Sequence, residues 1–123
     1  MASIIVTIGR EINGPYDGTR VGTSRDVWQL HEEDWQAFRE RVLHTLTPYG
    51  RVVFAGRGLG VNPFDRDSEE ESACFILVTN PVGNFESARR TSIRSDLLAI
   101  GREYGQLEIG YTVGEYRPID CRG

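Results

Sequence analysis

A glycine-rich stretch is the part of this 123-residue chain best suited to hold an anion. Residues 56–60 read GRGLG, which exposes backbone amides and adds the forked guanidinium of Arg57. The stretch runs on into Asn62 and Pro63 rather than into a helix, and it contains no Gly-Lys-Ser/Thr. It therefore matches neither a dinucleotide fingerprint nor a Walker loop. The alternative to an anion site is a flexible connection between two strands.

Two further arginines lie near the start of a helix that we expect over Phe85–Tyr104. Arg90 and Arg94 share one face of this helix, close to the end that favours anions. With Arg57 they are the first candidates for an anion pocket. Glu86 stands four residues before Arg90, so a salt-bridge ladder along the helix is the alternative.

A long loop expected over Gly9–Ser24 is a third candidate region, because loops of this length are often functional. It carries Arg10 and Tyr16, and Trp28 follows it. A guanidinium and aromatic rings suit stacking and hydrogen bonding to a base or a ribose. The alternative is a connection with scattered polar residues.

Residues 65–71 form an acidic run that reads DRDSEEE. The run lacks the glycine that a calcium-binding EF-hand needs at its sixth position, where Glu70 stands. A solvated loop is the ordinary interpretation. The other is a docking surface that mimics nucleic-acid phosphates and binds a basic partner protein. The candidate partner-binding residues are Asp65, Asp67, Glu69, Glu70 and Glu71.

No residue pattern in the chain indicates catalysis or a metal site. His31 and His44 have no neighbouring Cys or His at metal-ligand spacing, and no nucleophile stands beside a base in a known motif. We therefore expect a protein without enzymatic activity, metal or cofactor.

Composition narrows the class of partner. The net charge is -4 and the pI is about 5.2, which argues against general nucleic-acid binding and against adsorption to an anionic membrane. All 14 basic residues are arginine, so any anion site must use guanidinium groups or backbone amides. No signal peptide and no apolar stretch long enough to span a bilayer is evident, and we expect one cytoplasmic domain over residues 1–123.

Hydrophobic periodicity predicts two helices and four main strands. The expected helices are Glu32–Thr47 and Phe85–Tyr104. The expected strands are Ser3–Ile8, Arg51–Arg57, Ala73–Thr79 and Leu107–Val113, with a short strand or extended segment within Asp26–Leu30. The intervals Gly9–Ser24 and Gly58–Glu71 are expected to be loops.

The order strand, helix, strand, strand, helix, strand predicts an α+β fold. We expect a ferredoxin-like split βαβ sandwich, in which a four-stranded antiparallel sheet carries two helices on one face. The other face must then expose apolar side chains from two strands. The candidates are Cys74, Ile76 and Val78, or Ala73, Phe75 and Leu77, together with Val53 and Ala55 or Val52 and Phe54.

An open apolar face of this size predicts a homodimer or higher oligomer, formed through the sheet face or a sheet edge. The alternative is that the loops Gly9–Ser24 and Gly58–Glu71 fold over the face.

The chain also resembles a group of viral proteins at scattered positions. The opening VTIGR at 6–10, the pair Trp35 and Phe38, and the pattern YGQxxIxxTVG at 104–114 resemble small uncharacterised proteins encoded by bacteriophages of GC-rich hosts. The resemblance implies a small accessory protein that acts in the cytoplasm of a bacterial cell, with a counter-defence role as one form of it. It implies no site residues.

Three hypotheses about function follow. The first is an oligomer that sequesters a small anionic, nucleotide-like ligand. The second is an acidic inhibitor that docks on a basic surface of a host protein through Asp65–Glu71. The third is a small enzyme on a dimeric ferredoxin-like scaffold.

Overall fold

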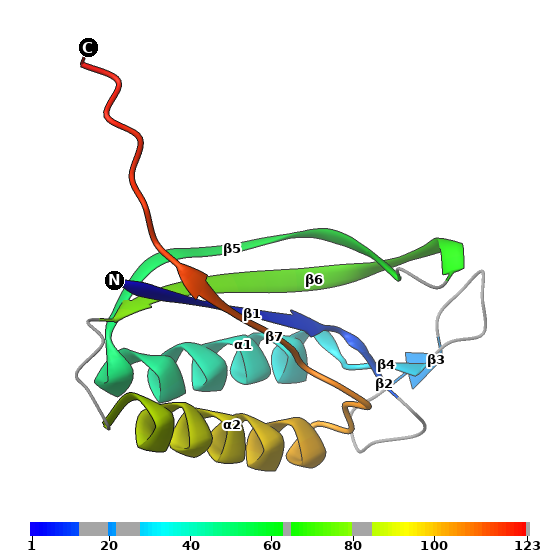
Figure 1. Ribbon diagram of the computed structural model, residues 1–123. Helices are drawn as coiled ribbons and strands as arrows, with labels where there is room; N and C mark the ends of the chain where they lie inside the picture. Colours follow the sequence, from blue (N-terminus) through cyan, green and yellow to red (C-terminus); the bar gives the residue numbers. More distant parts are fainter. Residues whose placement is uncertain (13–19, 22–27, 63–64, 80–84, 123) are drawn as a thin grey trace.

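The computed structural model describes residues 1–12, 20–21, 28–62, 65–79 and 85–122, without the side chains of 20–21, 61–62, 65–68 and 85–91. The fold is α+β: both helices lie on one face of a four-stranded antiparallel sheet (Figure 1). The helices are α1 (Glu32–Leu46) and α2 (Phe85–Glu103). The strands are β1 (Ala2–Gly9), β5 (Arg51–Asn62), β6 (Asp65–Thr79) and β7 (Gly110–Glu115), in the order β5-β6-β1-β7.

The helices form where the periodicity predicts them, and each buries an apolar stripe. In α1 the buried side chains are Trp35, Phe38, Val42 and Leu46. In α2 they are Ile93, Leu97 and Ile100, and Tyr104, directly after the helix, continues the stripe. The Phe38 and Tyr104 rings stack at 4.8 Å and join the two stripes. After α1 a short 3-10 turn, η1 (Thr47–Tyr49), carries the chain into β5.

Strand β1 supplies the central row of the core. Its side chains alternate, with Ile4, Val6 and Ile8 buried against the helices and Ile5 and Thr7 on the other face. Because β1 pairs with β6 on one side and β7 on the other, this alternation sets the face of every paired residue in its neighbours.

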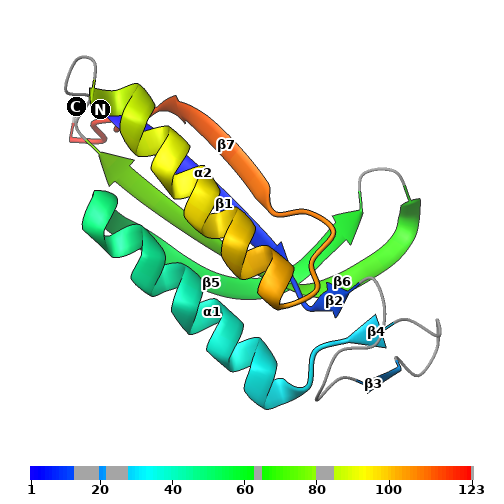
Figure 2. The same ribbon diagram turned by 90° about the horizontal axis from the view of Figure 1, so that it is seen from below.

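The expected loop over Gly58–Glu71 is wrong. Within the described residues, β5 and β6 continue pairing past the end of β1, with Gly58 opposite Ser72, Leu59 opposite Glu71 and Gly60 opposite Glu70. Figure 2 shows this two-stranded ribbon extending beyond the rest of the sheet. A strand pair outside the apolar core needs no apolar alternation, so a polar, glycine-rich sequence can extend a ladder that the neighbouring apolar residues have started.

The expectation that Val52 and Phe54 lie on the same face of β5 is also wrong. Val52 pairs with Leu77 and Phe54 with Ile76, so Val53 is an extra residue in a bulge. Val52 consequently faces the helices, whereas Phe54 faces away from them. A period-two interpretation puts these two residues on one face, because it cannot register an inserted residue.

A second, small sheet lies in the region expected to be mostly loop. It has the order β2-β4-β3, with β2 (Glu11–Ile12), β4 (Trp28–Gln29) and β3 (Arg20–Val21). The short strand expected within Asp26–Leu30 is confirmed, whereas β2 and β3 correct the expected loop Gly9–Ser24. Residues 13–19 and 22–27 lie outside the description.

The two sheets meet at Arg10, which is only 6% exposed. Its backbone N–H donates to the Glu71 carbonyl at 3.0 Å, and its carbonyl accepts from the Leu30 N–H at 3.0 Å. Its Nε donates to the Leu30 carbonyl at 2.7 Å. Its Nη1 lies 2.6 Å from Glu71 Oε2 and 3.1 Å from Glu32 Oε2. The end of β1 is thereby tied to β6 and to the start of α1.

Within the part of the chain that the structure describes, no helix is long and apolar enough to cross a membrane.

Replacing Arg10 tests this junction. Arg10→Met should lower the free energy of unfolding by about 3 kcal/mol, because it leaves the Glu71 carboxylate and the Leu30 carbonyl without their guanidinium partner. Urea unfolding measures the loss. Arg117→Met is the matched control, since the Arg117–Glu115 pair is exposed and contributes less than about 1 kcal/mol. Equal losses in the two variants would show that the Arg10 network stabilises nothing.

Candidate functional site

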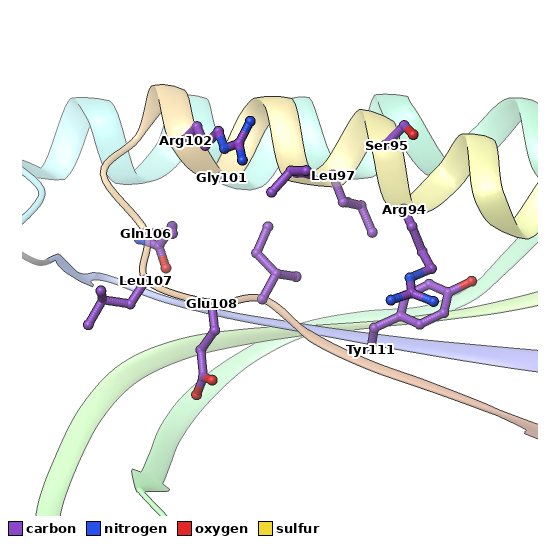
Figure 3. Close-up of a pocket in the computed structure, with 11 residues that line it drawn as sticks. Arg94, Ser95, Leu97, Gly101, Arg102, Gln106, Leu107, Glu108 and Tyr111 are labelled. Carbon is purple, nitrogen blue, oxygen red and sulfur yellow. The ribbon is translucent and has the colours of Figure 1, made fainter.

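A groove of about 570 Å³ lies between α2 and the segment that leads into β7. Figure 3 shows the two walls: side chains of α2 on one side and residues Gln106–Tyr111 on the other. The lining residues are Arg94, Ser95, Leu97, Leu98, Gly101, Arg102, Gln106, Leu107, Glu108, Ile109 and Tyr111.

The end of α2 shapes one wall. Gly105 has φ +68°, a left-handed conformation that glycine adopts without strain. The Gly105 N–H donates to the Arg102 carbonyl at 3.2 Å and the Gln106 N–H to the Gly101 carbonyl at 2.9 Å, which is the Schellman pattern. This turn sends the chain back along α2 and satisfies two terminal carbonyls.

Gly101 allows the returning chain to approach the helix closely. A Cβ at this position would lie 3.0 Å from Ile109 Cδ1. The Gln106 side-chain amide also donates to the Glu11 carbonyl at 3.4 Å, which joins this wall to β2. The groove is therefore held by contacts with both the helix and the small sheet.

Two guanidinium groups stand at opposite ends of the groove. Arg94 lies over the Tyr111 ring, with Cζ 5.9 Å from the ring centroid. Arg102 is eight residues further on, about 12 Å along the helix axis. Neither arginine forms an ion pair with a described residue. The Glu108 carboxylate points away from α2 (Figure 3), so the groove is positively charged in a chain of net charge -4.

Apolar surface fills the space between the two arginines. Leu98 is half exposed and Leu107 is 77% exposed. Ile109 is partly buried and packs against the core. Two leucines that are exposed beside a groove provide contact area for the apolar part of a ligand.

The structure does not bring Arg57 and Arg94 together. Arg57 lies on β5 and Arg94 lies over β7, at opposite edges of the sheet. Two strands separate them, so the predicted anion pocket of Arg57, Arg90 and Arg94 does not form within one chain. The side chain of Arg90 lies outside the described residues.

Arg57 instead lies near another arginine, Arg39. Because it pairs with Ala73, Arg57 is on the helix-facing side of β5. Burial, and then the positive charge of Arg57, hold the pKa of Arg39 below its ordinary value. The Arg39 guanidinium covers the Trp35 ring, with Cζ 5.2 Å from the centroid. Arg39 and Arg57 therefore lie beside α1, away from the groove between α2 and β7.

The other predicted ligand-binding residues are also apart from the groove. Arg10 holds the junction between the sheets with its Nε and Nη1 atoms. Trp28 pairs with Ile12 and packs, half buried, against the core. Tyr16 lies outside the described residues.

The acidic run is divided between internal and exposed roles. Glu71 pairs with Arg10, and a Glu70 oxygen accepts the Glu11 N–H at 3.0 Å. Glu69 is exposed, and the side chains of Asp65 and Asp67 lie outside the description. Part of the expected docking surface is therefore used within the chain.

Sequence reasoning found Arg94 but missed the rest of the groove. The available signal was a second stripe on the helix, Arg94, Leu98, Gly101 and Arg102, spaced at i, i+4, i+7 and i+8. This second stripe is hard to recognise, because the buried apolar stripe of the same helix is the stronger pattern. The returning wall, Gln106–Tyr111, was expected to be strand from Leu107, but pairing begins only at Gly110.

No protein-family model, curated protein or solved structure matches this chain. Among the residues that the structure describes, no group of three or more His, Cys, Asp or Glu is placed to hold a metal ion. The chemistry of the groove is therefore inferred from its own residues.

The close approach at Gly101 can be tested by adding side-chain volume. Gly101→Val should lower the free energy of unfolding by about 1–3 kcal/mol, because the added methyl groups push Ile109 out of place. Gly101→Ala should leave the free energy of unfolding nearly unchanged. Alanine favours the helix by about 1 kcal/mol over glycine, and the tight contact of its Cβ with Ile109 Cδ1 offsets this gain. Thermal unfolding measures both. Ala99→Val, on the exposed side of α2, is the control, and a Gly101→Val variant as stable as that control would contradict the packing.

Proposed function

We propose that this protein is a non-enzymatic binding protein whose groove between α2 and β7 takes a small amphipathic anion. The ligand class is a molecule with an apolar, preferably aromatic, body and a carboxylate, sulfonate or phosphate group. The observation that carries the proposal is the pair Arg94 and Arg102, without ion-pair partners among the described residues, at the two ends of an apolar groove.

The size and lining of the groove support this class. A volume of about 570 Å³ suits a ligand of nucleotide or drug size. Tyr111 is held under Arg94, so a planar ring can lie against the tyrosine while an anionic group reaches the guanidinium. Arg102 offers a second contact to a longer ligand. A nucleotide-like anion, with a base at one end and phosphate at the other, is one member of the class.

The scaffold that we propose is the ferredoxin-like split βαβ fold. Two observations support it: the main sheet and its helices follow the order strand, helix, strand, strand, helix, strand, and the strand order is β5-β6-β1-β7. In such a fold the second helix and the last strand lie side by side at one margin of the sheet, which is where the groove lies.

Docking of the acidic run on a host protein receives less support, because Glu70 and Glu71 are engaged within the chain. The hypothesis of a small enzyme has no support from the described groove, in which no nucleophile lies beside a base. A counter-defence role in a phage-infected cell rests on the sequence resemblance alone and stays a prediction.

A pair of fluorescent probes tests the groove. Anilinonaphthalene sulfonate carries aromatic rings and an anionic group, whereas N-phenylnaphthylamine carries the same rings without the charge. Arg94→Gln and Arg102→Gln should each weaken the sulfonate's binding about tenfold, the value of one charge-assisted contact. Binding of the uncharged probe should stay unchanged, because the apolar surface is intact. Fluorescence titration gives both dissociation constants.

Arg117→Gln is the matched control for charge, because it removes one exposed arginine from the C-terminal segment, away from the groove. A loss of sulfonate binding as large in Arg117→Gln as in Arg94→Gln would mean that only net charge matters. Unchanged sulfonate binding in both groove variants would contradict the proposed site.

A further inference from the structure

The face of the main sheet opposite the helices is apolar and carries almost no charge. Strand register places on it Ser3, Ile5 and Thr7 of β1, Cys74, Ile76 and Val78 of β6, Phe54 and Gly56 of β5, and Gly110, Thr112 and Gly114 of β7. This is one of the two sets expected from the sequence for β6. No helix or strand of the described chain lies across this face, and the C-terminal segment after β7 projects from the sheet on the same side (Figure 1).

Exposed apolar groups gather at its β5 edge. Phe54 is 53% exposed and Val53, the bulged residue, is 48% exposed. The Phe54 ring lies over Gly56, because a Cβ at Gly56 would be 2.8 Å from Phe54 Cζ. The ring therefore lies along the sheet, and the glycine leaves room for it. A flat aromatic group on a flat surface is the kind of anchor that interfaces use.

Charged residues on this face stand at its two ends. Arg51 is opposite Val78 at one end, and Glu70 is opposite Gly60 at the other. Between them lie only apolar, hydroxyl and glycine residues, although 26% of the chain is charged. Solvated sheet faces carry charged and polar side chains, so this distribution indicates a face that another surface covers.

The dimensions of the face agree with a small dimer interface. Four strands spaced by about 4.8 Å and eight residues rising by about 3.3 Å each give roughly 500 Å² per copy. Two copies would bury roughly 1,000 Å², which is the lower bound for a specific interface. Two sheets can pack in this way at a separation of about 10 Å.

We propose that the open sheet face binds a second copy of this chain. Both partners then present the same uncharged surface, so neither desolvates an unpaired charge. A two-fold axis that lies between the sheets and runs perpendicular to the strands places the Arg51 end of each copy over the Glu70 end of the other. The Glu70 carboxylate, which accepts the Glu11 N–H within its own chain, then lies toward the Arg51 end of the other copy. The helices and the groove remain on the outside of the pair, so this proposal does not depend on the ligand.

The two cysteines give a direct test with an internal control. Cys74 is half buried on the proposed interface, whereas Cys121 is exposed in the C-terminal segment. In the Cys121→Ser variant, the rate at which Cys74 reacts with a thiol reagent should fall as the protein concentration rises. A range from about 1 to about 100 µM brackets the affinity of so small an interface. In the Cys74→Ser variant, the rate for Cys121 should not change with concentration.

Sedimentation velocity on substituted proteins locates the contact independently. Phe54→Glu should weaken the dimer about 30-fold, as expected for an aromatic anchor, and Thr112→Arg should weaken it from the other edge strand. Leu59→Glu is the matched control: Leu59 is on the same strand as Phe54, is 71% exposed and pairs with Glu71 on the opposite face. It should change the dissociation constant less than about threefold. Thr112 and Leu59 are exposed, so both variants keep the fold even where Phe54→Glu does not.

A monomer at all concentrations, or a Cys74 rate that does not depend on concentration, would overturn the proposal. So would a dimer that survives both Phe54→Glu and Thr112→Arg, or one that Leu59→Glu disrupts equally, because the contact would then lie elsewhere.

Discussion

The fold depends on one buried positive charge. A guanidinium that is removed from water must be paired and hydrogen-bonded, so the groups around Arg10 have little freedom of position. Leu30 and Glu32 lie at the entry to α1 and Glu71 lies on β6, and each of the three contacts Arg10 directly. The contact with Leu30 sets where the chain arrives before α1, and the contact with Glu71 sets where the β5–β6 ribbon leaves the sheet. A single residue at the end of β1 thereby orients the small sheet, the first helix and the long hairpin.

The two surfaces with functional potential lie on opposite sides of the sheet. The groove is at the helix side, over β7, where the Schellman turn after α2 brings the chain back. The uncharged face is at the other side, formed by alternate residues of the same strands. In β7, Tyr111 faces the groove and its neighbour Thr112 faces the open side. Period-two geometry therefore lets one short strand line both the proposed ligand site and the proposed interface without conflict between them.

The elements that were predictable from the sequence are those with a buried apolar stripe. The residues Trp35, Phe38, Val42 and Leu46 made α1 evident, and alternation did the same for β1. The continued pairing of β5 and β6 through Gly58–Gly60 and Glu69–Glu71 was not predictable, because none of these residues belongs to the buried apolar core. The bulge at Val53 was hidden because it changes register without changing composition. Of the predicted anion-binding residues, Arg94 lines the groove, but Arg57 lies at the opposite edge of the sheet. The sequence could not show this separation, because strand order is set by contacts between residues far apart in the chain.

The position of β1 in the sheet has a consequence for biosynthesis. It leaves the ribosome before the other strands of the main sheet, yet its hydrogen-bonding partners are Ser72–Thr79 and Gly110–Glu115. The β5–β6 hairpin can form from local contacts, but β1 stays unpaired until that hairpin has emerged, and the sheet closes only with the last strand. Non-local pairing of this kind slows folding, and it leaves the apolar row Ile4, Val6 and Ile8 exposed on the nascent chain. The same strand that organises the finished protein is thus the segment most in need of protection while the protein is being made.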